Sequence, residues 1–205
     1  MKILVVKPFK EDQDVAPIIE ATFSDTEDHE IDLLFADYCI GDKVFNQNIK
    51  KIEGVAHSKL PQTLFDDVFT AHHTEKCRIL YHNLEFSEIA NHFLFFDKLK
   101  SNYDLIVSLE GSRMEPVTGY VSKITGPMAN SDVNMTYCDF ILERDGVRIP
   151  YYHYSAPSSL QNYPLFSFRC NILKEAASNL PQLLTQNVLS FHIPDGLVTI
   201  YGESE

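Results

Sequence analysis

Four short polar segments, each directly after an aliphatic run, hold the residue types that bind a phosphorylated ligand. Carboxylates accept hydrogen bonds from base N–H and ribose O–H groups, aromatic rings stack on a base, and Lys or Arg neutralises phosphate. Ligands of open parallel sheets bind outside the carboxyl ends of the strands. Residue types suited to a nucleotide are therefore present in KPFK at 7–10, DYC at 37–39, HN at 82–83 and EGSR at 110–113.

The aliphatic runs before these segments predict the strands that position them. Residues 3–6 are an unbroken aliphatic run, typical of a strand buried on both faces of a parallel sheet, and further strands are predicted at 30–36, 77–81 and 103–109. Helical periodicity alternates with them, at 15–23, 86–100 and 116–124. The last of these helices is expected to open on Pro116 and to stop at Gly126-Pro127. This alternation predicts an α/β domain with a largely parallel sheet, while residues 52–76 follow neither pattern.

The last third of the chain changes character. Strand-like runs at 135–143 and 147–153 flank Asp145-Gly146, and Asp-Gly between such runs is a strong hairpin signal. A helix at 168–177 and two short strands, at 188–193 and 197–201, are expected to follow. Because the sequence contains no repeat or linker, residues 1–205 are predicted to form one α/β domain. Its central sheet is expected to be mixed but mostly parallel, flanked by helices, with an antiparallel hairpin in the C-terminal part.

Composition and charge narrow the class of protein. The 205 residues are 44% hydrophobic and 22% charged, enough for a full core. The net charge of −12 argues against a nucleic-acid partner, since a phosphate backbone would be repelled. No run approaches the ~20 apolar residues of a membrane span, so neither a transmembrane segment nor a signal peptide is expected. Four cysteines without a CxxC pair indicate buried thiols in a reducing compartment, the cytoplasm.

Four segments, in this order, resemble the GT-A fold of inverting family 2 glycosyltransferases, and the resemblance spans nearly the whole chain. They are ILVVKPFKEDQDVAPIIEATFSDT, EIDLLFADYCIGD, RILYHNLEFSEIANHFLFFDKLKSNYDLIVSLEGSRMEP, and the C-terminal group MTYCDFILERDGVRIPYYHY, FSFRCNILKEA and FHIPDGLVTIYGES. The resemblance implies a single GT-A-like, Rossmann-like domain and a hexosyltransferase of polysaccharide biosynthesis. Its substrates would be a nucleotide sugar of the UDP type and a carbohydrate or lipid-linked acceptor.

The resemblance also implies which residues bind the donor. Asp37 corresponds to an acid that contacts the uracil or ribose, and Glu110 to the DXD motif that holds Mn²⁺ or Mg²⁺ on the two phosphates. Glu110 is the only acid in LEGSR, so Arg113 would share the neutralisation of the pyrophosphate. Each of the two acids has an alternative interpretation as an ordinary loop residue. The expected nucleotide-sugar-binding residues are Pro8, Phe9, Lys10, Asp37, Asn91, Glu110, Ser112 and Arg113.

An inverting transferase also needs a carboxylate that takes the proton from the acceptor hydroxyl. In the resembled family this acid lies between the helix similar to FSFRCNILKEA and the final strands. The corresponding interval here, SNLPQLLTQNVLS, contains no Asp or Glu. The candidates for the catalytic base are therefore Asp139 and Glu175, each with a structural alternative: Asp139 inside a strand and Glu175 on a solvated helix face.

Two other functions stay open on the sequence. A chain that kept the fold but lost catalysis would act as a nucleotide-binding or assembly protein, which the single acid in LEGSR favours. Half of a two-domain GT-B transferase is suggested by YDLIVSLEGS, whereas the hairpin and closing strands after residue 133 favour a self-contained GT-A domain. The sequence contains no GxGxxG, Walker A or GxSxG motif, which argues against dinucleotide, P-loop and hydrolase functions.

Overall fold

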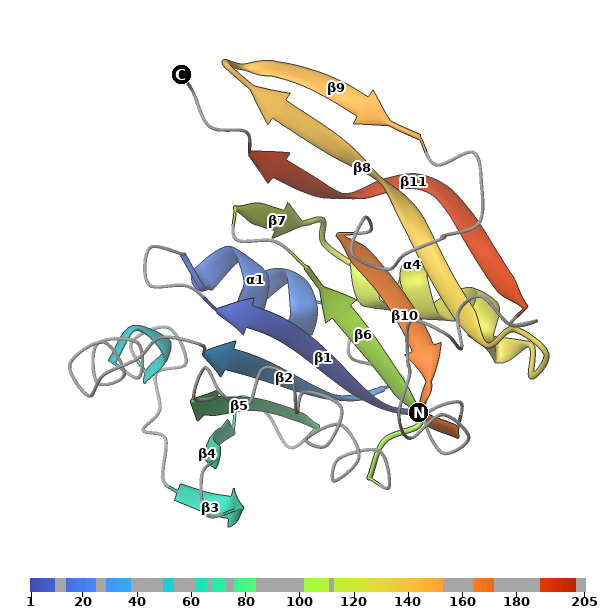
Figure 1. Cartoon of the computed structure of the whole chain (residues 1–205). Helices are drawn as coiled ribbons and strands as arrows, with labels where there is room; N and C mark the ends of the chain where they lie inside the picture. The colour runs from blue at the N-terminus through green and yellow to red at the C-terminus, as the bar shows by residue number, and fades with distance from the viewer. Residues whose placement is uncertain are drawn as a thin grey trace.

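Figure 1 shows the computed structural model of the chain, whose described strands form one large sheet. The structure describes residues 1–9, 14–24, 29–37, 50–53, 62–65, 68–72, 76–83, 102–110, 113–152, 164–171 and 189–201. No helix within these residues is long and apolar enough to cross a membrane.

The first strand–helix–strand unit follows the sequence pattern. β1 (Lys2–Phe9) and β2 (Glu30–Asp37) pair in parallel over their whole length. Between them, α1 (Ala16–Phe23) starts where the Ala16 N–H donates to Asp14 Oδ1 at 3.1 Å. Ile18 and Ile19 of α1 are buried in one apolar cluster with aliphatic residues of both strands, so the apolar face of α1 packs on the sheet. The predicted order of these three elements is confirmed.

Two further parallel strands complete the centre of the sheet. β5 (Cys77–Asn83) pairs with β2, and β6 (Leu105–Leu109) pairs with β1. Beyond β5 the sheet continues with antiparallel strands, β4 (Val68–His72) and β3 (Gln62–Phe65), which lie in the stretch that follows no clear sequence pattern. Residues 50–53 form a short helical segment. The predicted helix at 86–100 lies outside the described residues.

The helix predicted from Pro116 begins later than expected. The elements here are β7 (Met114–Pro116), α4 (Tyr120–Thr125) and the 3-10 helix η3 (Gly126–Ala129). Pro116 ends a strand because the next residue, Val117, donates its N–H to the Leu197 carbonyl at 2.9 Å. Gly119 then adopts a left-handed φ of 74° just before α4, which favours glycine. The prediction of Pro116 as the first helical residue was therefore wrong, since pairing with a distant strand holds it extended.

The C-terminal third adds four strands. They are β8 (Met135–Arg144), β9 (Val147–Tyr151), β10 (Leu165–Arg169) and β11 (Ser190–Tyr201). β8 and β9 form the predicted hairpin, with φ of 54° at Asp145 and 76° at Gly146. Positive φ at both turn residues is the conformation that Asp-Gly favours in a two-residue hairpin loop.

Two predictions in this part were wrong. Phe168 and Arg169, expected to start a helix, end β10, because β10 is inserted between β6 and β8 and pairs with both. Only residues 170–171 of the expected helix are helical among those described. The two closing strands are one strand, β11, whose register along β8 shifts between Ile193 and Gly196. A β-bulge absorbs Pro194 and Asp195 without ending the pairing.

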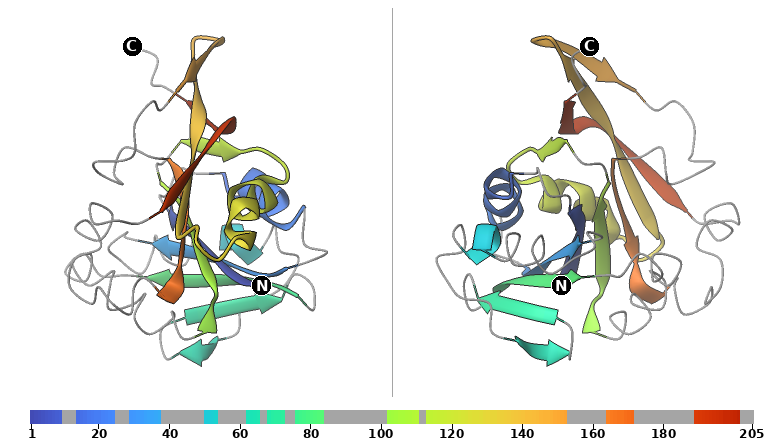
Figure 2. Two further views of the ribbon diagram at one scale, coloured as in Figure 1. Left: turned by 90° about the vertical axis from the view of Figure 1, so that its right-hand side faces the viewer. Right: turned by 60° about the vertical axis from the view of Figure 1, so that its left-hand side comes forward.

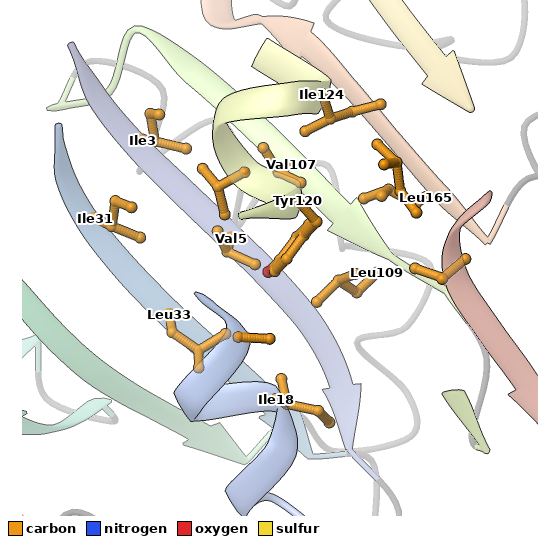
Figure 3. Close-up of a cluster of buried hydrophobic side chains, with 14 of the residues drawn as sticks. Ile3, Val5, Ile18, Ile31, Leu33, Val107, Leu109, Tyr120, Ile124 and Leu165 are labelled. Atoms are coloured by element: carbon orange, nitrogen blue, oxygen red, sulfur yellow. The ribbon is translucent and has the colours of Figure 1, made fainter. Parts of the chain in front are cut away.

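The described strands form a mixed sheet in the order β3-β4-β5-β2-β1-β6-β10-β8-β11-β7, with β9 on β8. α1 and α4 lie on the same face of this sheet (Figures 1 and 2), which we call the helix-covered face. There Ile18 and Tyr120 pack with Val5 and other strand residues (Figure 3). The opposite face carries a second apolar cluster that includes Leu4 and Phe166. The predicted class, a Rossmann-like α/β fold with a mixed central sheet, is confirmed.

Gly146→Ala is expected to lower the free energy of unfolding by about 1 kcal/mol, because a φ of 76° is unfavourable for any residue with a Cβ. Gly126→Ala is the matched control: neither new Cβ would have a heavy atom within 4 Å, but Gly126 has φ −51°. The control should be neutral or stabilising by up to about 1 kcal/mol. Urea unfolding measures both, and equal losses would contradict the role of the turn.

Candidate functional site

The carboxyl ends of the parallel strands meet at one edge of the sheet. Phe9 in β1 pairs with Asp37 in β2, and Asp37 pairs with Asn83 in β5. Pro8 is half-buried one residue earlier in β1, and Glu110 directly follows β6. The fold therefore brings these predicted positions to a common edge. Four other predicted site residues lie outside the described part of the chain: Lys10, Asn91, Ser112 and Glu175.

Glu110 is held at both its backbone and its side chain. Its N–H donates to the Pro164 carbonyl at 2.8 Å, and Ser108 Oγ donates to Glu110 Oε1 at 2.6 Å. Within the described residues, no three His, Cys, Asp or Glu side chains lie together as metal ligands. A divalent cation at Glu110 would thus depend on oxygens from a ligand.

A row of paired residues leads from Ser108 across the sheet. Ser108 of β6 pairs with Phe166 of β10, and Phe166 pairs with Tyr137 of β8. Tyr137 in turn pairs with His192 of β11. Paired residues project to the same side of a sheet, so all four lie on the face opposite α1 and α4.

At the far end of this row, His192 contacts a buried acid. His192 Nε2 lies 2.8 Å from Asp139 Oδ1, and the side chains are 29% and 3% exposed respectively. The His192 ring also stacks on Tyr137, with centroids 5.1 Å apart and planes at 17°. Burial and the charge of Asp139 raise the pKa of the Tyr137 phenol, which keeps it neutral. A carboxylate and an aromatic ring together fix the imidazole.

Glu110 and Asp139 flank β10 on one face of the sheet. β10 pairs with β6 on one side and with β8 on the other. Two strand spacings of ~4.8 Å put the backbones of β6 and β8 about 10 Å apart. The sequence indicates both acids as candidates, but it does not indicate His192. The signal that could have found it is the HIP segment of the last strand, read together with a parallel pairing of β8 and β11.

The two described basic residues near the expected site differ in exposure. Lys7 pairs with Phe35 and is fully buried on the helix-covered face. It therefore points away from the face that carries Glu110. Arg113 is exposed just before β7, where its carbonyl accepts the Tyr201 N–H at 2.9 Å. Arg113 has the exposure that contact with a phosphate requires, whereas Lys7 belongs to the interior.

Asp32 is a buried acid near the amino end of β2, far along the strand from Asp37. Arg78 Nε donates to Asp32 Oδ1 at 2.8 Å, and Arg78 Nη2 and Tyr103 Oη both donate to Oδ2. The hydrogen bond to Asp32 raises the pKa of Arg78, and burial raises the pKa of Tyr103. This network joins β2, β5 and the segment before β6, so its role is structural.

Comparison with known proteins finds similarity in structure alone. No family model and no curated protein matches the sequence. S. aureus TarS 1–349 in complex with UDP-GlcNAc matches with a TM-score of 0.60 and 12% identity, over 100% of this chain and 60% of that one. A longer S. aureus TarS chain gives 0.58 and 9%, over 98% and 36%. Glucosyl-3-phosphoglycerate synthase from Mycobacterium tuberculosis, in complex with Mg²⁺ and UDP, gives 0.51 and 10%, over 99% and 72%.

These similarities define the class of fold. The chain has a GT-A-like glycosyltransferase fold, and it spans 60% of TarS 1–349 and 36% of the longer TarS chain. The pairing of β8, β9 and β11 into the same sheet as β1 argues against half of a GT-B transferase. At these identities the similarity establishes the fold and not the reaction.

Asp32→Asn is expected to lower the free energy of unfolding by about 2 kcal/mol, because it leaves Arg78 without its buried counter-charge. This expected loss is below the usual cost of breaking a buried ion pair, because the Arg78 side chain is 23% exposed. Asp132→Asn, at an exposed acid, should change stability by less than ~0.5 kcal/mol. Chemical denaturation checks both, and a loss at Asp32 no larger than at Asp132 would rule out the structural role.

Proposed function

We propose that this chain is a glycosyltransferase domain that transfers a sugar from a nucleotide sugar to a hydroxyl of a carbohydrate or lipid-linked acceptor. The observation that carries this proposal is the placement of Glu110 and Asp139 on one face, flanking β10, within a GT-A-like fold. Sugar transfer needs one group near the phosphates of the leaving nucleotide and another near the acceptor hydroxyl. The carboxyl edge of a parallel sheet is where such ligands bind.

The proposed donor is a UDP-sugar. Its support is that TarS was solved with UDP and with UDP-GlcNAc, and the mycobacterial synthase with UDP. In this chain Asp37, at the end of β2, would accept hydrogen bonds from the uracil or ribose, with Phe9 as its neighbour in β1. The rest of the proposed donor-binding set comprises Pro8, Lys10, Asn91, Glu110, Ser112 and Arg113.

A divalent cation, Mn²⁺ or Mg²⁺, is proposed to bind together with the donor. Glu110 would be its protein ligand, although Glu110 Oε1 already accepts the Ser108 hydroxyl. Magnesium is usually held by one or two carboxylates plus substrate phosphates, so a single Glu suffices once the diphosphate is present. When bound, the cation would neutralise charge on the departing diphosphate. Arg113, exposed nearby in sequence, would contribute to the same neutralisation.

Asp139 and Glu175 are the carboxylates proposed to serve proton transfer, Asp139 through its contact with His192 and from a strand that pairs with β10. A second candidate function is a nucleotide-binding or assembly protein without catalysis. It is favoured by Glu110 being the only acid in LEGSR. Both candidate functions use the same donor site, but only the glycosyltransferase turns the donor over.

The cytoplasm is the proposed location, with a role in polysaccharide biosynthesis. Support for a reducing compartment comes from the buried cysteines of the described part of the chain, Cys77, Cys138 and Cys170. Burial raises the pKa of the Cys138 thiol to about 12, so this cysteine is an inert part of the interior.

UDP is expected to raise the melting temperature, because a ligand at 100 times its Kd stabilises the native state by about 2.7 kcal/mol. Asp37→Ala should abolish this shift and leave the ligand-free protein folded. Asp132→Ala, at an exposed acid beyond α4, should keep the shift. Differential scanning fluorimetry with UDP, GDP, CDP and ADP, with and without Mn²⁺, makes the comparison. No shift with any of the four would sink both candidate functions.

Mn²⁺ alone is expected to bind weakly and to gain affinity when UDP supplies its phosphate oxygens. Glu110→Gln should remove the gain, whereas Glu20→Gln, on the exposed side of α1, should retain it. Isothermal titration calorimetry with Mn²⁺, in the presence and absence of UDP, measures the two affinities. Tight Mn²⁺ binding to the ligand-free protein that Glu110→Gln abolishes would show a preformed metal site instead.

A further inference from the structure

The Asp139–His192 pair contains one accessible partner and one inaccessible partner. Asp139 has a side chain that is 3% exposed, and its Oδ1 already accepts from His192. A general base must come within ~2.6–3.2 Å of the proton that it removes. Asp139 is therefore too deeply placed to touch an acceptor hydroxyl, which changes the role expected of it from the sequence.

His192 has the position and the lone pair that this chemistry requires. Its side chain is 29% exposed and lies on the same face as Glu110. Because a carboxylate only accepts hydrogen bonds, the hydrogen between the two residues belongs to His192 Nε2. In the neutral ring Nδ1 then carries the free lone pair, so the Asp139 contact selects the tautomer with a basic Nδ1.

The surroundings of His192 support this assignment. Tyr137 covers one face of the imidazole and remains neutral, so Asp139 is the charged group that β8 directs at the ring. Asp195 follows on β11 itself, in the bulge. β6 and β11 are three strand spacings apart, about 14 Å, which separates the group proposed for the phosphates from His192. A role for His192 in the transfer requires that a donor bound at Glu110 has its sugar between the two.

We propose that His192 is the general base of the sugar transfer and that Asp139 is its positioning residue; this inference rests on the proposed function. As the acceptor O–H bond breaks, the oxygen bonds to the anomeric carbon and the proton goes to His192 Nδ1. The bond from that carbon to the diphosphate oxygen breaks, and UDP leaves with the electron pair. The Asp139 carboxylate stabilises the imidazolium until the proton passes to water.

The test uses the full chain with UDP-glucose and UDP-GlcNAc, and with water as the acceptor, so that UDP release reports turnover. His192→Ala should lower kcat by about 10²- to 10⁴-fold, the usual contribution of general-base catalysis, with the Kd for UDP unchanged. Added imidazole should restore part of the lost kcat to this variant. His29→Gln, just before β2 at the amino end of the sheet, is the matched control and should behave as wild type.

Asp139→Asn tests the positioning role separately. It should lower kcat with little change in KM, and nitrogen NMR of the His192 ring should show that the preference for the Nε2–H tautomer is weakened. If His192→Ala melts below the assay temperature, His192→Gln replaces it in the kinetic comparison.

Three outcomes divide the two proposals. Rescue of His192→Ala by imidazole, at unchanged UDP affinity, supports the inference. UDP binding by wild type with equal UDP release from the His192 variants, or with no release from either sugar nucleotide, overturns the role of His192 and leaves donor binding intact. Failure of wild type to bind UDP removes the proposed function, and the inference with it.

Discussion

β10 is antiparallel to both of its neighbours and joins the N-terminal parallel strands to the C-terminal part of the sheet. Leu165 and Phe168 are buried on opposite faces, so this one strand contributes to both apolar clusters. At its end, the Arg169 guanidinium donates to the backbone carbonyl oxygens of Met128 in η3 and of Asn130 and Val133 just after it. Since β6 and β8 pair with β10 and not with each other, its presence sets the separation of Glu110 from Asp139.

Buried polar groups in this sheet are stabilised by pairing, and the chemistry of the partner distinguishes their roles. Asp32 is enclosed by Arg78 and Tyr103, and that network joins strands. Asp139 is equally buried, but its partner His192 keeps a ring nitrogen that can accept a hydrogen bond, whereas the Arg78 guanidinium only donates. Removing a carboxylate from water is costly unless hydrogen bonds compensate it. The hydrogen bond with His192 compensates the burial of the Asp139 carboxylate. It also holds a partly exposed imidazole next to that buried charge.

The comparisons show how little sequence this fold requires. Chains that share 9–12% of their residues with this one superpose with TM-scores of 0.51 to 0.60. Buried strands need apolar side chains of suitable volume in the correct period, and many sequences meet that requirement. Function depends instead on a few polar positions at strand ends, so a substitution at one of them can leave the fold intact.

The sequence by itself determined the elements whose signals are local. Aliphatic runs specify β1, β2, β5 and β6, because such runs bury both faces of a strand, and Asp145-Gly146 specifies the hairpin because its backbone conformation suits that turn. Only the tertiary structure decided that Pro116 and Phe168 are in strands, and that His192 meets Asp139, which is 53 residues away. The physical reason is that hydrogen bonding between distant strands overrides local helical periodicity, and the strand order that creates those bonds leaves no local pattern in the chain.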